Sequence, residues 1–232
     1  MKTRILILLA LFNFITMRSQ ILMSLIFGDK LNSKELSFGI HLDQSWNTMS
    51  NTESSSSLTS FNLGLFFNYM IDEHWRGNLE MLAKYQRGAS DLPVYPTGDS
   101  LLDTQFMYGN IDREINYLSL PISIQYVTKP GIYAEIGPQI SLRFKAKDIF
   151  NADINDEELR YIRDIKDETT NFDLGWLAGI GYYIGKAKTT SIGFRYYGGF
   201  TDVMKNIENK QHHNQWAIYA NIPIGRHENP ED

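Results

Sequence analysis

The chain has 232 residues, a formal net charge of −5 and no cysteine. The acidic balance argues against a nucleic-acid-binding protein, which normally shows a basic patch, and the lack of cysteine excludes disulfides and thiolate chemistry. Beyond the N-terminus, no run of about 18 apolar residues occurs, which excludes a helical membrane protein. Aromatic residues make up 13% of the chain, and this richness favours β structure.

The N-terminal segment 1–20 has the layout of a secretory signal peptide. Two basic residues precede an apolar run from Ile5 to Ile15, and we place the cleavage after the small residue Ser19. The alternative is one uncleaved anchor from Ile5 to Phe27. That anchor would hold Arg18 near its centre, where a charge is costly. Both interpretations predict that the chain leaves the cytoplasm.

After a lead-in over residues 21–34, eight segments alternate apolar and polar residues, most of them over about ten positions. Such alternation is typical of a strand with one apolar face, and about ten residues is the length of a tilted strand that crosses a membrane. The segments are 35–46, 60–71, 75–86, 115–127, 131–148, 172–185, 189–200 and 215–225.

Segment 131–148 shows the question that all eight segments raise. Its even positions, from Ile132 to Ala146, are apolar, whereas its odd positions include Glu135, Arg143 and Lys145. In a soluble sandwich the apolar face would form the core. In an outer-membrane barrel it would meet lipid, and the charges would lie inside.

The connections between the segments decide between these folds, because short and long connections alternate strictly. Three short ones contain DEH, TKPG and GKAK. The four long ones are Asn47–Thr59, Arg87–Asp112, Lys147–Asn171 and Asp202–Asn214. All tight turns then lie at one end of the sheet, as in outer-membrane barrels. We therefore expect an all-β fold: an eight-stranded antiparallel transmembrane β-barrel over residues 35–225 with short periplasmic turns, long extracellular loops and a tail over 226–232.

The polar faces predict what fills the barrel. An eight-stranded barrel is just wide enough inside for side chains, so opposite charges can pair there, and His41 should also face the lumen. The expected lumen charge network is Arg76, Glu80, Lys84, Glu135, Arg143, Asp173 and Arg195. We expect little or no conductance through this lumen.

Aromatic residues near the ends of the segments predict two girdles at the membrane interfaces. Those near the tight turns are Tyr69, Trp75, Tyr126 and Tyr182. Those toward the long loops are Phe144, Phe172, Trp176 and Trp216, with Trp46, Tyr85 and Phe200.

Four motifs occur in a characteristic order: YLSLP at Tyr117–Pro121, GPQISL at Gly137–Leu142, DLGWLAGIGY at Asp173–Tyr182 and RYYGGFTDV at Arg195–Val203. Together they resemble the PorT-like outer-membrane β-barrel family. The resemblance implies an eight-stranded barrel in the cell outer membrane and, from some relatives, a link to secretion or gliding machinery. The chain departs from the family at Ile224–Gly225, where the usual terminal aromatic residue of the last strand is missing.

No pattern in the chain singles out a chemical site. The neighbours His212 and His213, near Glu208, should point apart on a strand, whereas a metal needs convergent ligands. No Ser/His/Asp spacing identifies a triad, which is in any case recognised by geometry. We therefore expect no catalytic residue, no cofactor and no metal, and thus no enzyme.

The third long loop, over 151–170, looks helical. Asn155 could cap this helix with Glu158 at the reciprocal position, and Leu159, Ile162 and Ile165 form a thin apolar stripe. It would be either a solvated surface helix or a docking site for another envelope protein.

The sequence as a whole favours an accessory or structural outer-membrane barrel. Its expected partners are outer-membrane lipid and an envelope or secretion-machinery protein that binds the loops, with no nucleic acid. The alternatives are a small-solute channel and a secreted soluble ligand-binding barrel.

Overall fold

The computed structural model describes residues 32–33, 35–54, 56–154, 157–185, 188–205 and 207–224. The predicted signal peptide, the predicted tail and most of the predicted lead-in lie outside the described residues. Within the described part of the chain, no helix has the length and apolar character needed to cross a membrane.

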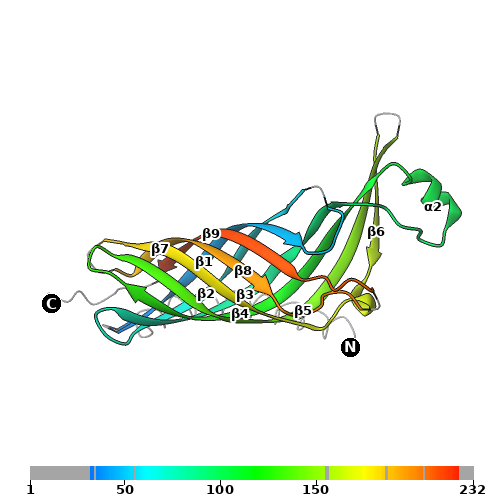
Figure 1. Cartoon of the computed structure of the whole chain (residues 1–232). Helices are drawn as coiled ribbons and strands as arrows, with labels where there is room; N and C mark the ends of the chain where they lie inside the picture. Colours follow the sequence, from blue (N-terminus) through cyan, green and yellow to red (C-terminus); the bar gives the residue numbers. More distant parts are fainter. Residues whose placement is uncertain are drawn as a thin grey trace, which may run out of the picture.

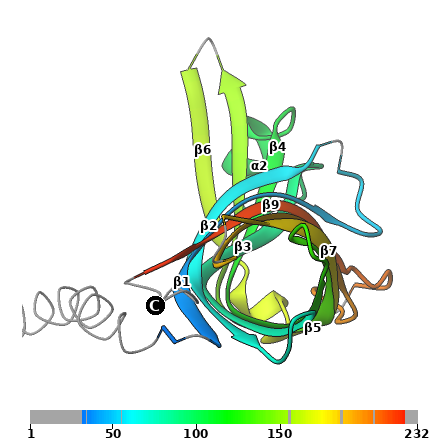
Figure 2. The same ribbon diagram turned by 90° about the vertical axis from the view of Figure 1, so that its left-hand side faces the viewer.

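Eight antiparallel strands close into a barrel (Figures 1 and 2). They are β1 (Leu36–Met49), β2 (Leu58–Met70), β3 (Trp75–Leu92), β4 (Asn110–Val127), β5 (Ile132–Ile154), β7 (Phe172–Ile184), β8 (Thr190–Gly199) and β9 (His213–Pro223). Each strand pairs with the next in this order, and β1 pairs with β9 to close the ring. The eight predicted segments correspond to these strands, which confirms the predicted fold class.

The distribution of side chains in the barrel is inside out relative to a soluble protein. Along β7, Phe172, Leu174 and Trp176 are exposed on the outer face, whereas Asp173 is buried in the lumen. The other strands repeat this pattern, with buried polar side chains such as Ser119 on β4 facing inward. An apolar band outside and a polar interior are the arrangement of a barrel whose outer face meets hydrocarbon.

The tight turns and the long connections lie at opposite ends, as the sequence predicted. The β2–β3, β4–β5 and β7–β8 turns lie at the left-hand end of the barrel in Figure 1. The β1–β2, β3–β4, β5–β7 and β8–β9 connections lie at the other end. One of the long connections holds a short helix that the sequence did not reveal, α2 (Ser100–Gln105), which Asp99 caps by accepting from two backbone N–H groups.

The predicted helix over 151–170 is wrong. β5 continues to Ile154, and β6 (Glu157–Asp164) turns back to pair with it, before a single 3-10 turn, η1 (Lys166–Glu168). In β6, Leu159, Tyr161 and Arg163 are partly buried, and the even-numbered residues between them are exposed. The apolar side chains therefore follow the period of a strand, and pairing with β5 outweighs the local helical pattern.

Two β-bulges also overturn part of the predicted alternation. The register between β3 and β4 shifts between Leu82 and Tyr85, so that Lys84 lies outside while Tyr85 is buried inside. The register of β5 shifts against β4 beyond Arg143, so that Ala146 faces inward. A bulge places one extra residue in a strand and so reverses the faces of all residues that follow.

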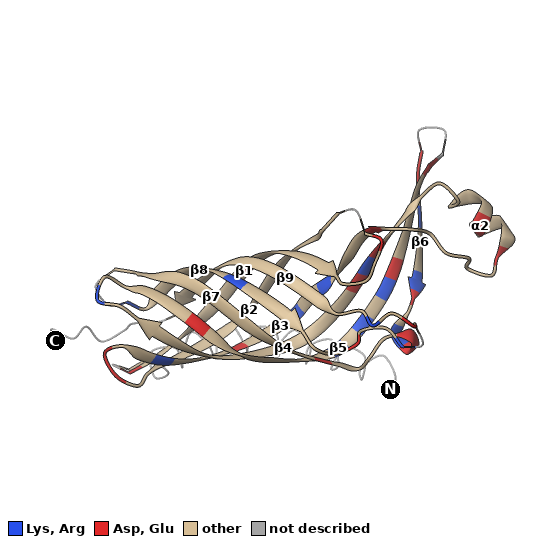
Figure 3. Cartoon of the chain, in the orientation of Figure 1, with Lys and Arg blue, Asp and Glu red and all other residues tan. Residues whose placement is uncertain are grey.

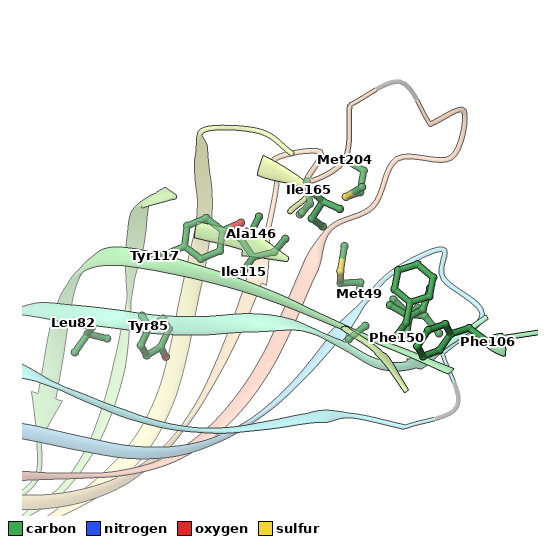
Figure 4. Packing of buried hydrophobic residues seen from close by; sticks show 14 residues of the cluster. Met49, Leu82, Tyr85, Phe106, Ile115, Tyr117, Ala146, Phe150, Ile165 and Met204 are labelled. Atoms are coloured by element: carbon green, nitrogen blue, oxygen red, sulfur yellow. The ribbon is translucent and has the colours of Figure 1, made fainter. Parts of the chain in front are cut away.

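Beyond the barrel, the upper parts of β3, β4 and β5 continue into a small sheet that β6 completes. We call this sheet, with α2, the extension. Its β5–β6 hairpin bends away nearly perpendicular to the barrel axis (Figure 1). A buried apolar cluster supports its base. The rings of Phe106 and Phe150 meet edge-on with their centres 5.8 Å apart, and the cluster extends through Met49 to Ile165 and Met204 (Figure 4).

Candidate functional site

The lumen holds the first candidate site, a group of buried charges around Arg195 on β8. The Arg195 guanidinium makes two 2.7 Å hydrogen bonds to the Glu80 carboxylate on β3. Its Nε donates to Glu135 on β5, also at 2.7 Å, and the guanidinium lies over the Tyr219 ring at 4.4 Å. Because β8, β3 and β5 are not neighbours in the sheet, these contacts cross the lumen.

His41 extends this group on the other side of Glu80. Its Nδ1 lies 3.6 Å from a Glu80 carboxylate oxygen, and its Nε2 lies 3.3 Å from Asp43. All of these side chains are almost completely buried. A buried carboxylate is tolerated only when it is paired and hydrogen-bonded, so the group holds together as one network.

A second layer, nearer the long connections, is built around Arg87 on β3. Arg87 donates to Asp173 on β7 and, at 3.2 Å, to the Ser141 hydroxyl on β5. Its guanidinium lies 3.9 Å from the Tyr197 ring centre, with Tyr85 and Tyr117 at 5.2 and 5.3 Å. Cation–π contacts of this kind add to the ion pair. The sequence predicted a long connection at Arg87, whereas β3 continues to Leu92. It predicted Tyr85 outside because Tyr85 follows the bulge at Lys84.

A third layer occupies the end of the lumen beside the tight turns. Arg76 lies over the Tyr183 ring at 4.2 Å and donates to the Lys188 carbonyl oxygen at 2.7 Å. The Tyr183 hydroxyl donates to Gln125 at 2.5 Å. With a further hydrogen bond between Tyr133 and Tyr219 at 2.6 Å, side chains bridge non-neighbouring strands at three levels.

Five of the seven predicted lumen charges are buried inside the barrel: Arg76, Glu80, Glu135, Asp173 and Arg195. Two are placed elsewhere. Lys84 lies on the outer face because of the bulge in β3. Arg143 is partly exposed at the base of the extension, where it donates to the Lys166 carbonyl oxygen and to Asn171.

The eight aromatic side chains expected to form the main girdles are all exposed on the outer face: Tyr69, Trp75, Tyr126, Phe144, Phe172, Trp176, Tyr182 and Trp216. Several of them touch, such as Trp75 and Tyr126, whose rings meet edge-on at 5.0 Å. Of the other three, Phe200 is exposed and Trp46 partly buried, whereas Tyr85 lies in the lumen.

The two adjacent histidines point to different surroundings, as expected for a strand. The Nε2 of His213 lies 3.0 Å from the Tyr117 hydroxyl in the lumen, and the Nδ1 of His212 lies 3.0 Å from the Thr201 carbonyl oxygen. Among the described residues, no group of three or more His, Cys, Asp or Glu side chains could hold a metal ion.

Comparison with known families agrees with this geometry. Residues 31–205 match the family model described as "Outer membrane protein beta-barrel domain". The chain belongs to this family. It is therefore an outer-membrane protein, and the apolar outer face of its barrel lies in membrane lipid.

Solved structures similar to the chain include other outer-membrane proteins. Ail, the attachment invasion locus protein of Yersinia pestis, is 15% identical over 81% of this chain and 96% of its own, with a TM-score of 0.43. Neisserial surface protein A is 15% identical over 82% and 99%, also at 0.43. OprG from Pseudomonas aeruginosa is 13% identical over 82% and 97%, at 0.36. No curated protein sequence matches the chain.

The extension is the second candidate site. Figure 3 shows charged residues gathered at the end of the barrel that carries it. Arg113 on β4 binds Asp148 on β5 through two hydrogen bonds of 2.7 and 2.8 Å. Asp148 also accepts from the Tyr95 hydroxyl, and that oxygen accepts from Arg163 on β6. This chain of contacts ties the hairpin to the loop that precedes α2.

Tyr95 connects an aromatic contact to this polar chain. Its ring packs edge-on against Phe150 at 5.2 Å. Burial, and next the neighbouring Asp148 carboxylate, raise the pKa of Tyr95 to about 12, so that the hydroxyl keeps the proton it donates. The hairpin is therefore a braced structure rather than a loose loop, and it presents a fixed surface outside the barrel.

Proposed function

We propose that this protein is a non-enzymatic accessory or structural barrel of the outer membrane, with a lumen closed by side chains. The observation that carries the proposal is the set of contacts across the lumen at three levels, around Arg76, Arg195 and Arg87. Bulky tyrosine rings pack against each of these guanidinium groups. An eight-stranded barrel leaves no room for a water-filled channel beside such side chains.

The extension is the part of the molecule that we propose binds a partner, an envelope or secretion-machinery protein. It projects from the end of the barrel that carries the long connections, and its hairpin is braced by the contacts of Tyr95 and Asp148. Because the hairpin already has a fixed shape before binding, it avoids the loss of conformational entropy that a flexible loop would incur.

The motif order from Tyr117 to Val203 supports our further proposal that the chain is a PorT-like member of its family. The layout of residues 1–20 likewise supports a cleaved signal peptide. N-terminal sequencing of the protein from isolated outer membranes tests the second proposal, because cleavage after Ser19 would leave Gln20 as the first residue.

Single-channel recording in planar bilayers tests the closed lumen. We expect no large, stable openings from protein whose insertion is shown by a heat-modifiable gel shift. Large, stable openings from such protein would overturn the closed lumen and favour the small-solute channel.

Cross-linking in intact envelopes tests the interaction surface. Replacing residues 151–160 with a short turn shortens the hairpin in register, because Phe150 pairs with Tyr161. We expect the full chain to give an adduct that the shortened variant loses while its gel shift is kept. Equal adducts from both proteins would place the partner elsewhere.

A further inference from the structure

The β5–β6 hairpin leaves one edge of its sheet open. β6 pairs with β5 along one side, and no other described strand pairs with its other side. Its eight residues, EELRYIRD, contain no proline, and five of them are charged. An edge strand is a template for pairing with another strand, and charged side chains on it disfavour partners whose charges do not match.

The backbone groups at this edge can be assigned from one hydrogen bond. The Ile165 N–H donates to the Ala146 carbonyl oxygen at 3.2 Å. Because residues of an antiparallel strand alternate between the two sides, odd-numbered residues of β6 direct their backbone groups to β5. Glu158, Arg160, Ile162 and Asp164 direct theirs to the open edge, and their side chains are all exposed.

The charges of these residues are complementary to those of the same strand running the other way. The order is negative at Glu158, positive at Arg160, apolar at Ile162 and negative at Asp164, and Lys166 follows in η1. When two β6 strands pair antiparallel about Ile162, Arg160 of each copy lies opposite Asp164 of the other copy. Glu158 then lies toward Lys166 at both ends.

The neighbouring registers lack this match. Pairing centred on Tyr161 places Glu158 opposite Asp164, and pairing centred on Arg160 places that residue opposite its own copy. Like charges directly opposite each other destabilise a strand pair. Of these three registers, only the one centred on Ile162, which is 54% exposed, pairs opposite charges along most of the strand.

The orientation of the hairpin suits two copies in one membrane. Viewed along the barrel axis in Figure 2, β5 and β6 lie side by side with their broad faces toward the viewer, so the hairpin sheet lies across the barrel axis. The two-fold axis of an antiparallel strand pair is perpendicular to its sheet. It would therefore run along the membrane normal, and both barrels would have the same orientation in the bilayer.

We propose that the open edge of β6 binds β6 of a second copy of this chain, in the antiparallel register centred on Ile162. The inference rests on the proposed role of the extension as an interaction surface and names the partner. Two hairpins would then form one continuous sheet above the membrane, with a closed two-fold interface.

Disulfide trapping tests the register directly, because the chain has no cysteine of its own. In the variant Ile162→Cys the two substituted positions would be opposite each other, with Cα atoms about 5.5 Å apart, within reach of a disulfide. In the control Glu158→Cys, on the same face of the same strand, they would be about 27 Å apart at about 3.4 Å per residue. We expect oxidised cells to give at least about tenfold more dimer from the first variant.

Charge exchange provides a second readout that does not depend on a thiol. Arg160→Asp in the Ile162→Cys background should reduce the trapped dimer, and adding Asp164→Arg should restore it. A heat-modifiable gel shift confirms that each barrel folds. Equal dimer from both cysteine positions, or no rescue by the exchange, overturns the proposed register.

The outcomes also separate this inference from the proposed function. If Ile162→Cys stays monomeric under oxidation while shortening of the hairpin still removes the envelope adduct, self-pairing is overturned. The extension would then bind a different partner. Trapped dimers from a barrel that conducts ions would support self-pairing and overturn the closed lumen.

Discussion

Arg195 and Glu80 lie on strands that are not neighbours, β8 and β3, and their side chains meet inside the barrel in two hydrogen bonds of 2.7 Å. The same guanidinium also binds Glu135 on β5. One side chain thus joins three parts of the barrel wall. Its removal would leave two carboxylates buried with one cation fewer, and this defines the first prediction.

Arg195→Met keeps an unbranched apolar stem and removes the guanidinium with its charge. We expect a loss of about 3–5 kcal/mol in the free energy of unfolding, because a buried charge that loses its partner is strongly destabilising. Equilibrium urea unfolding in phospholipid vesicles measures this. The control Lys210→Met removes an exposed cation and should change the value by about 0.5 kcal/mol or less. Equal effects of the two substitutions would contradict the structural role of Arg195.

Gly193 gives the second prediction, because it makes room for a tyrosine. A Cβ at this position would lie 2.5 Å from the Cζ atom of Tyr219. Gly193→Ala should therefore destabilise the barrel by about 1–3 kcal/mol through overpacking. At Gly77 on β3, a Cβ meets nothing within 4 Å, so Gly77→Ala is a matched control. Thermal gel-shift midpoints should fall for the first variant alone, and a lower midpoint for both would point to a general effect of removing strand glycines.

The sequence predicts the barrel well because its decisive signals are global. The alternation along the strands and the placement of tight turns at one end follow from closing a sheet in lipid, and every strand repeats them. Glu80, Glu135 and Arg195 were therefore assignable to the lumen from their position in the alternation alone.

Local irregularities were not predictable from the same pattern. Lys84 looks like a regular strand residue, yet it has a φ of +56° in a bulge that only pairing with β4 reveals. The segment that contains β6 carries both a helical stripe and a strand alternation, and only the position of β5 decides between them. Arg87 was assigned to a connection because the predicted segment ends at Gln86, whereas β3 continues to Leu92.

Deletion of Lys84 tests the bulge. Without this residue the alternation of β3 would run on unbroken from Leu82, and Tyr85 and Arg87 would still face the lumen. We therefore expect the variant to keep the heat-modifiable gel shift. Deletion of Ile180, which pairs in regular register with both neighbouring strands, should abolish the shift because one half of β7 would turn its polar face to lipid. Loss of the shift in the Lys84 deletion would show that the barrel depends on the bulge itself.

Asp72, in the β2–β3 turn, gives a prediction on pH. Its carboxylate accepts from the backbone N–H groups of His74 and Trp75 at 2.7 and 2.8 Å. These two bonds, that from His74 first, lower the pKa of Asp72. Because the pKa is lower in the folded turn, the stabilisation is complete above the unfolded value of about 3.9 and is lost as the pH falls through the folded value.

Amide hydrogen exchange at His74 and Trp75 in detergent micelles measures this effect. Asp72→Ala should speed exchange at both amides near neutral pH, once the rates are corrected for intrinsic exchange. The difference from the unchanged protein should shrink as the pH falls below the lowered pKa, because the protonated carboxyl is a weaker acceptor. Glu73→Ala, a substitution of the exposed neighbour, should give the same exchange at both amides as the unchanged protein at every pH. Were the difference between Asp72→Ala and the unchanged protein independent of pH, the protection would come from the turn backbone and not from the charge of the carboxylate.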